Sequence, residues 1–352
     1  MQTQTAAEKI QNIKSPYFFN IWTDAVLIIL SPVLALLCGM AVSYSPWSAK
    51  TYTVNGQAES AAGVAVGILT MAHLVIVIVR SYLNPAVLKR FKKRLILGPA
   101  VLFTGMMLSS WVLVLVFVVA VWWDVYHSSL QTFGIGRIYD LRAGNGAHAG
   151  RKLDRGLNLL LYAGPVVSGL TFWEHVVHFK KFESVGTPLF GRIPAFAMNY
   201  QRYLAWFLIL SGSVYIVYYL IMYRKLRTDG YRVSTQKIWL FASTGLCSVL
   251  TWGFNPFGQA FFIMNLFHAV QYFALIWWSE GSNVTGLLGL QKIKRGDAAA
   301  FAVLFGSALL YGIWAKLWGE SSHLGFSILL TVSIMHFWFD GFIWSVRKSH
   351  VA

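Results

Sequence analysis

The sequence predicts an all-α fold, a polytopic bundle of transmembrane helices. Of the 352 residues, 57% are hydrophobic and only 12% are charged, about half the charged fraction of a typical soluble domain. The apolar residues are also gathered into runs of roughly 18–25 residues, the length that crosses the hydrocarbon of a bilayer as a helix. We therefore expect one transmembrane helical domain over residues 1–352.

Nine apolar runs give ten expected helices. The run 95–134 is too long for one span, so we divide it near Ser109–Ser110. The segment 45–60 between the first two spans is expected to be a polar loop. The expected spans are 22–43, 61–80, the two parts of 95–134, 156–176, 202–223, 236–253, 257–279, 298–318 and 325–346.

The basic residues indicate how the helices are oriented. The formal net charge is +16, and with ten spans the densest Lys/Arg clusters, such as KRFKKR and RKLRTDGYR, fall on one side together with the two termini. The positive-inside rule then predicts that both termini are cytoplasmic, in a multi-pass protein of a bacterial inner membrane. Nucleic acid is not an expected partner, because the cations lie at the ends of segments and not on one continuous face.

Four of the nine histidines fall inside expected spans. Their depth follows from the distance to the charged end of each span. His73, His127, His268 and His336 lie 7, 10, 12 and 11 residues before Arg80, Arg137, Glu280 and Arg347. At 1.5 Å per residue these distances correspond to roughly 10–18 Å. Four separate helices thus carry an imidazole at a similar depth, and we expect the four imidazoles to meet around one centre.

Polar side chains accompany these histidines at same-face spacings of three or four residues. The companions are Asp124 and Gln131 around His127, Asn265 and Gln271 around His268, and Asp340 after His336. Imidazole and carboxylate groups on facing helices form metal sites in helical bundles, and this ligand set suits iron, manganese or zinc.

The sequence therefore predicts an intramembrane site for one or two iron ions, with manganese or zinc as alternatives. The expected ligands are His73, His127, His268, His336, Asp124 and Asp340. We expect Asp124, Gln131 and Gln271 to take part in catalysis, the two amides by orienting the imidazoles together with Asn265.

Two other motifs are expected to lie outside this site. Glu174, His175 and His178 form an E-H-x-x-H sequence at the outer end of span 156–176. We interpret it as a solvated helix end, although a shift of the topology by one span would bring it to the site. The segment around Arg137, Tyr139 and Asp140 carries four glycines whose spacing fits neither a P-loop nor a dinucleotide fingerprint. We expect a turn-rich loop there, over the inner mouth of the site. The four glycines are Gly134, Gly136, Gly144 and Gly146.

Histidines ringed inside a membrane bundle resemble the integral-membrane non-haem iron enzymes. These are the fatty-acid desaturases and hydroxylases and the carotene-cleaving dioxygenases of the Brp/Blh type. The desaturase motifs H-x-x-x-H and H-x-x-H-H are absent, and only His175 and His178 give an H-x-x-H. Histidines within the spans are nearer to the Brp/Blh type, whose H-G-A-x-D signature is also absent. WDVYHSSLQTFGIGRIYD and NLFHAVQYFALIWWSE resemble segments of other bacterial polytopic membrane proteins.

Together these features favour a membrane oxidoreductase that uses dioxygen on a hydrophobic lipid or isoprenoid-like substrate, with an electron-donor protein as a further expected partner. One alternative is a proton-coupled transporter with a His/Asp relay, in which Pro32, Pro99 and Pro165 could break helices. The other is a haem-binding electron-transfer subunit with paired histidines as axial ligands.

Overall fold

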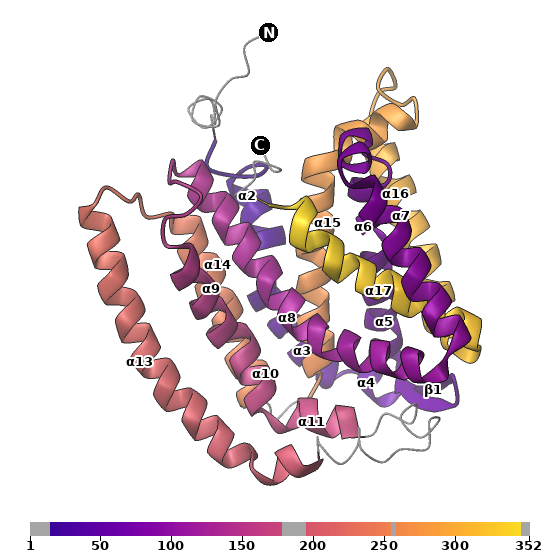
Figure 1. Ribbon diagram of the computed structural model, residues 1–352, viewed down its shortest axis with the longest axis horizontal. Coiled ribbons are helices and arrows are strands. Elements are labelled where there is room, and N and C mark those ends of the chain that lie inside the picture. The colour runs from indigo at the N-terminus through magenta and orange to yellow at the C-terminus, as the bar shows by residue number, and fades with distance from the viewer. Residues whose placement is uncertain (1–14, 178–194, 255–257, 346–352) are drawn as a thin grey trace. The chain divides into compact units, whose positions relative to one another are not determined.

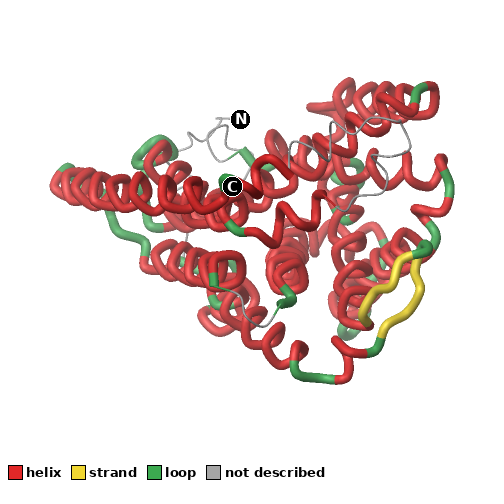
Figure 2. Tube along the Cα trace, turned by 90° about the horizontal axis from the view of Figure 1, so that it is seen from below, coloured by secondary structure: helices red, strands yellow, loops and turns green. Residues whose placement is uncertain are grey.

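A computed structural model describes residues 15–177, 195–254 and 258–345. The described chain is almost entirely helical, as Figures 1 and 2 show, which confirms the predicted all-α class. Six of its helices are long and apolar enough to cross a membrane. A seventh is added if the bent pair Ile21–Ile29 and Ser31–Ser43 forms one span. The chain is therefore compatible with a multi-pass membrane protein.

The other three predicted spans fall on helices that are individually too short or too polar to meet this criterion. They lie on α7 (Pro85–Leu108), on the interrupted run from α9 to α11, and on α14 with the π-helical turn η4. The chain divides into two compact units, which are described separately. Unit 1 comprises Met1–Leu36, Asp124–Ala260 and Trp344–Ala352, and unit 2 comprises Leu37–Trp123 and Phe261–Ile343.

Unit 2 contains one hairpin and most of the long helices. Its elements are α4 (Pro46–Ala49), β1 (Thr51–Val54), β2 (Gln57–Ser60), α5 (Ala61–Val75), α6 (Val77–Ser81), α7, α15 (Ala260–Leu287), α16 (Gly296–Leu317), η5 (Gly319–Ser321) and α17 (His323–Ile343). The end of α3 (Ser31–Ser43) and the first part of α8 (Ser110–Arg142) complete it.

The segment expected to be a polar loop contains a short hairpin. Strands β1 and β2 pair antiparallel, with Val54 opposite Gln57. Asn55 and Gly56 have φ angles of 50° and 75°, the left-handed conformation that a two-residue type I′ turn requires at both positions. The Asn-Gly pair was the signal for this turn, and the loop prediction overlooked it.

Helices α5 and α16 pack closely enough for their backbones to touch. A Cβ atom at Gly312 would lie 2.2 Å from the carbonyl oxygen of Ile68 and 3.1 Å from the amide nitrogen of Ala72. Small residues permit such an approach between helices in lipid, where close packing supplies much of the attraction. Helix α5 begins at Ser60, whose hydroxyl accepts a hydrogen bond from the amide of Gly63 at 3.0 Å.

The division of the long apolar run near Ser109–Ser110 is confirmed. Ser109 is extended, with φ −147° and ψ 119°, between α7 and α8. The predicted end of the following span was wrong, because α8 continues to Arg142. The expected loop glycines Gly134 and Gly136 therefore lie inside a helix. At Gly136 an added Cβ would lie 2.6 Å from the ring of Phe241, so this glycine permits a close helix contact.

Unit 1 is built largely from interrupted helices. Its elements are α2 (Ile21–Asp24), η1 (Ala25–Ile29), the start of α3, the second part of α8, α9 (Arg151–Asn158), η2 (Leu159–Ala163), α10 (Gly164–Ser168), α11 (Leu170–Val177), α13 (Gln201–Thr228), α14 (Thr235–Ser248) and η4 (Val249–Gly253).

Two serines on α14 compensate for the π-helical turns beside it. The hydroxyl of Ser243 donates to the carbonyl of Ile29 in η1 at 2.5 Å. The hydroxyl of Ser248 donates to the carbonyl of Tyr162 in η2 at 2.8 Å. A backbone carbonyl without a partner is costly in hydrocarbon, so these hydroxyls stabilise the interruptions.

Candidate metal centre

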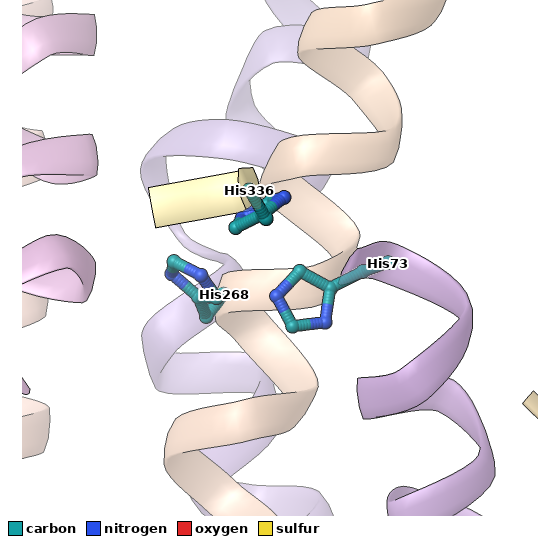
Figure 3. A group of neighbouring side chains, drawn as sticks. All are labelled: His73, His268 and His336. Carbon is teal, nitrogen blue, oxygen red and sulfur yellow. The ribbon is translucent and has the colours of Figure 1, made fainter. Parts of the chain in front are cut away.

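Three of the predicted histidines converge inside unit 2. His73 comes from α5, His268 from α15 and His336 from α17, and Figure 3 shows their rings facing a common point. They are 1%, 2% and 0% exposed. One ligand nitrogen from each lies within 4.8 Å of the other two. The structure thus brings together imidazoles that are far apart in the sequence.

The rings contact one another edge to face. The ring of His73 has its centroid 4.9 Å from that of His268 and 5.1 Å from that of His336. Neither ring nitrogen of His73 has a hydrogen-bond partner among the described residues. Burying a polar nitrogen without a partner is unfavourable, and a bound cation would supply one. Metal–imidazole bonds of about 2.0–2.1 Å place neighbouring ligand nitrogens about 3 Å apart, which is compatible with three nitrogens that all lie within 4.8 Å of one another.

Tyr272 and Asp340 form a polar pair beside the three rings. Tyr272 is fully buried, with its ring centroid 4.5 Å from that of His336. Its hydroxyl donates to Oδ1 of Asp340 at 2.8 Å. The other oxygen of Asp340 lies 3.9 Å from Nε2 of His336. Asp340 is a residue that the sequence predicts for this site, whereas Tyr272 is not, although its spacing of four from His268 indicates a shared helical face.

The amides expected around His268 differ in their surroundings. Gln271 is fully buried on α15. The side-chain amide of Asn265 donates to the carbonyl of Phe261 at 2.9 Å, within the same helix. The amide nitrogen of Asn265 thus donates to its own helix, and a role of Asn265 in orienting an imidazole stays a prediction.

The remaining predicted site residues belong to unit 1. Asp124, His127 and Gln131 lie on the second part of α8, and His127 and Gln131 are buried. The hydroxyl of Ser128 donates to Oδ1 of Asp124 at 3.4 Å. All three histidines of the cluster belong to unit 2. The roles of Asp124, His127 and Gln131 as ligands or catalysts stay predictions.

The E-H-x-x-H motif is described only in part. Glu174 is exposed on α11, which agrees with a solvated helix end for this residue. The side chain of His175 and all of His178 lie outside the described residues.

A buried ion pair joins two of the helices near the histidines. Arg80 and Glu280, which the sequence analysis used as charged ends of spans, are 7% and 1% exposed. Nη1 of Arg80 lies 2.7 Å from Oε1 of Glu280, and Asn84 donates to Oε2 at 3.0 Å. Each charge is neutralised by its partner, so neither needs water. The pair fixes the end of α6 against α15.

Unit 1 contains a buried network of four charges that the sequence analysis did not predict. Arg137 pairs with Asp140 and, at 2.7 Å, with Asp154, while Nζ of Lys237 lies 2.9 Å from Asp140 and 3.2 Å from Asp154. All four side chains are at most 4% exposed. Two positive and two negative charges balance, which is the condition for burying charges at an acceptable cost.

Tyrosines complete this network. Tyr219 and Tyr223 donate to Asp154 at 3.0 and 2.5 Å, and Tyr231 donates to Asp140. Burial, with the negative charge of Asp140 beside it, raises the pKa of Tyr231, which therefore remains a hydrogen-bond donor. The prediction of a loop around Asp140 was wrong because α8 continues through it, and the helix turns Arg137 and Asp140 to one face.

Comparisons with protein-family models, with curated proteins and with solved structures give no match for this chain.

Proposed function

We propose that this protein is a membrane oxidoreductase whose iron ion is bound by His73, His268 and His336. The observation that carries the proposal is the convergence of three buried imidazoles from three helices, with ligand nitrogens within 4.8 Å. Three neutral imidazoles form an open metal site in known metalloenzymes and leave coordination positions for reactants. Manganese and zinc are the alternative metals for the same ligands.

The proposed reaction is oxidation of a hydrophobic lipid or isoprenoid-like substrate by dioxygen. The metal would supply activation of dioxygen, and an electron-donor protein would supply reducing equivalents where the reaction consumes them. Buried apolar side chains on the helices that carry the histidines, such as Ile263 on α15 and Phe337 on α17, support this substrate class, because apolar surroundings would bind an acyl or isoprenoid chain and exclude water. Within unit 2, Asp340 is the nearest carboxylate to His336, at 3.9 Å, and would complete the ligand set or hold the imidazole. Gln271 is proposed as a supporting group, while the roles of His127, Asp124 and Gln131 stay predictions from the sequence.

We further propose ten spans in a bacterial inner membrane, with both termini cytoplasmic. Support comes from the Lys/Arg clusters, which fall on one side of the membrane with this number of spans. Helix α7, the interrupted run α9–α11 and α14 with η4 would add to the long apolar helices.

Metal analysis tests the proposal. Protein purified without chelators should contain about one equivalent of iron per chain, since all three ligands are buried and held by the fold. His73→Ala, His268→Ala and His336→Ala should each abolish it. His148→Ala, which removes an exposed imidazole in unit 1, should retain it. Less than about a tenth of an equivalent of any transition metal in the unaltered protein would overturn the proposal.

The two other functions give different results. The 56° bend between Ile21–Ile29 and Ser31–Ser43 is the observation that favours a transporter, because broken helices form the binding sites of many transporters. Uptake that depends on pH in proteoliposomes of metal-free protein would support that function. A haem with paired histidine ligands would need two imidazoles on opposite faces of the macrocycle, whereas the rings of His73, His268 and His336 meet edge to face. A Soret band in the absorption spectrum would nonetheless establish haem.

A further inference from the structure

The first half of α7 carries the highest concentration of positive charge in unit 2. Five of the six residues from 89 to 94 are cationic, and all five side chains are exposed. None of them lies within ion-pair distance of a carboxylate among the described residues. We name these residues the α7 cationic patch: Lys89, Arg90, Lys92, Lys93 and Arg94.

The patch stands on a helix whose start is firmly fixed. The side chain of Asn84 accepts hydrogen bonds from the amides of Ala86 and Val87, and Pro85 occupies the first helical position. The N-terminus of a helix carries partial positive charge of its own, which adds to that of the patch. A fixed, uncompensated positive surface favours an anionic partner.

The patch is also anchored to α17. The ring of Phe91 lies 4.7 Å from that of Phe342, and the guanidinium group of Arg94 lies 5.5 Å above the same ring. Further along α7, a Cβ atom at Gly98 would lie 2.3 Å from the ring of Trp338, so the helices are in close contact there. The backbone that carries the cations is therefore packed against α17.

The surface that adjoins the patch identifies the kind of anion. Directly after the cations, α7 exposes large apolar side chains. Ile96, Leu97 and Val101 are 49%, 59% and 71% exposed. A soluble acidic protein would leave these side chains in water, whereas a phospholipid would cover them with acyl chains while its phosphate contacts the cations.

We propose that the α7 cationic patch binds the headgroups of anionic phospholipids. The apolar residues from Ile96 onward then contact the acyl chains of the same lipids. This site is independent of the metal centre, because no patch residue contributes a ligand nitrogen or oxygen to the histidine cluster.

Native mass spectrometry of the detergent-solubilised full chain tests the site. The probes are phosphatidylglycerol and phosphatidylcholine with identical acyl chains. Each cation removed near an anionic headgroup should weaken binding about fivefold. Lys89, Lys92 and Lys93 changed together to Gln should thus weaken phosphatidylglycerol binding by about a hundredfold and leave phosphatidylcholine binding unchanged. The same three residues changed to Arg should retain binding.

The control changes two exposed cations of α9 in unit 1, Lys152 and Arg155, to Gln, because no large apolar side chain of this described helix is exposed beside them. This variant should keep the phosphatidylglycerol affinity of the unaltered protein. Equal losses in both variants, or equal affinity for both lipids, would overturn the proposal, as would displacement of phosphatidylglycerol by inorganic phosphate or an acidic soluble protein. If the triple Gln variant fails to fold, Lys92→Gln alone should still show the fivefold loss. The Gln variants should contain as much iron as the unaltered protein, so the lipid-binding result can be judged separately from the proposed metal centre.

Discussion

Single side chains decide the chemistry of unit 2. His73, His268 and His336 provide neutral nitrogen ligands, and Asp340 is the carboxylate beside them, held by the hydroxyl of Tyr272. A carboxylate next to a cation stabilises the bound metal through charge, and it also fixes the orientation of an imidazole. The contribution of the Asp340 charge to metal affinity can therefore be separated from that of the histidine ligands by removing the charge alone.

Asp340→Asn removes this charge and keeps an oxygen that can accept from Tyr272. We expect metal affinity to fall by about 10–100-fold, while the free energy of unfolding of the metal-free protein changes by less than about 1 kcal/mol. Competition with a chelator of known affinity measures the first quantity. Asp297→Asn, which alters the exposed carboxylate that accepts from Thr285, is the control and should leave metal affinity unchanged. Equal affinity in both variants would exclude a role for the charge of Asp340.

At the scale of the elements, the position of the histidines depends on helix contacts. Helix α5 carries His73 and is in backbone contact with α16 at Gly312, next to Ala72. The glycine at this contact is thus expected to matter for the metal centre although it lies outside it. Gly306, on the same helix as Gly312, has no atom within 4 Å of an added Cβ.

Gly312→Ala and Gly306→Ala should therefore have opposite effects. The first places a methyl group against backbone atoms that cannot move aside, so we expect a destabilisation of about 1–3 kcal/mol and loss of bound metal. The second should leave stability unchanged or raise it by up to about 1 kcal/mol, because alanine favours helix over glycine. Unfolding in detergent, followed by circular dichroism, measures both. Similar stability for the two variants would contradict the close contact of α5 and α16.

The elements also show what could be predicted from the sequence. Apolar runs indicated the positions of the helices and the break at Ser109, because hydrocarbon length imposes a strong constraint. The hairpin at Asn55–Gly56 was missed because it lies between spans, where that constraint does not apply. The similar depth of His73, His268 and His336 could be counted along the chain, whereas Tyr272 carries no charge and does not stand out in an apolar helix.

For the molecule as a whole, the two units differ in how they bury ionisable groups. Unit 2 gathers imidazoles, and unit 1 gathers a balanced network of Arg137, Asp140, Asp154 and Lys237. The sequence could not predict this network because its members come from three helices and pair only after folding. The balance of charge makes each member dependent on the others.

Lys237→Met leaves two buried carboxylates with one cation, Arg137. We expect a loss of about 3–5 kcal/mol in the free energy of unfolding. Adding Asp140→Asn restores neutrality and should recover a large part of the loss, a non-additivity that a double-mutant cycle measures. Lys225→Met, at an exposed position, should change stability by less than about 0.5 kcal/mol. Strict additivity of the first two substitutions would show that the charges are not coupled.

The π-helical turns of unit 1 have a consequence for how this sequence is aligned. Each such turn accommodates one residue more than an α-helical turn, so the chain beyond Ala25–Ile29 and beyond Leu159–Ala163 is rotated by about 100° relative to an uninterrupted α-helix. Two residues that flank a π-helical turn therefore share a helical face at spacings of about four or five residues, and not three or four. A relative with straight helices would then lack one residue in each segment. The hydroxyls of Ser243 and Ser248 donate to carbonyl groups of the interrupted turns, so we expect a serine at these positions where the extra residue is present.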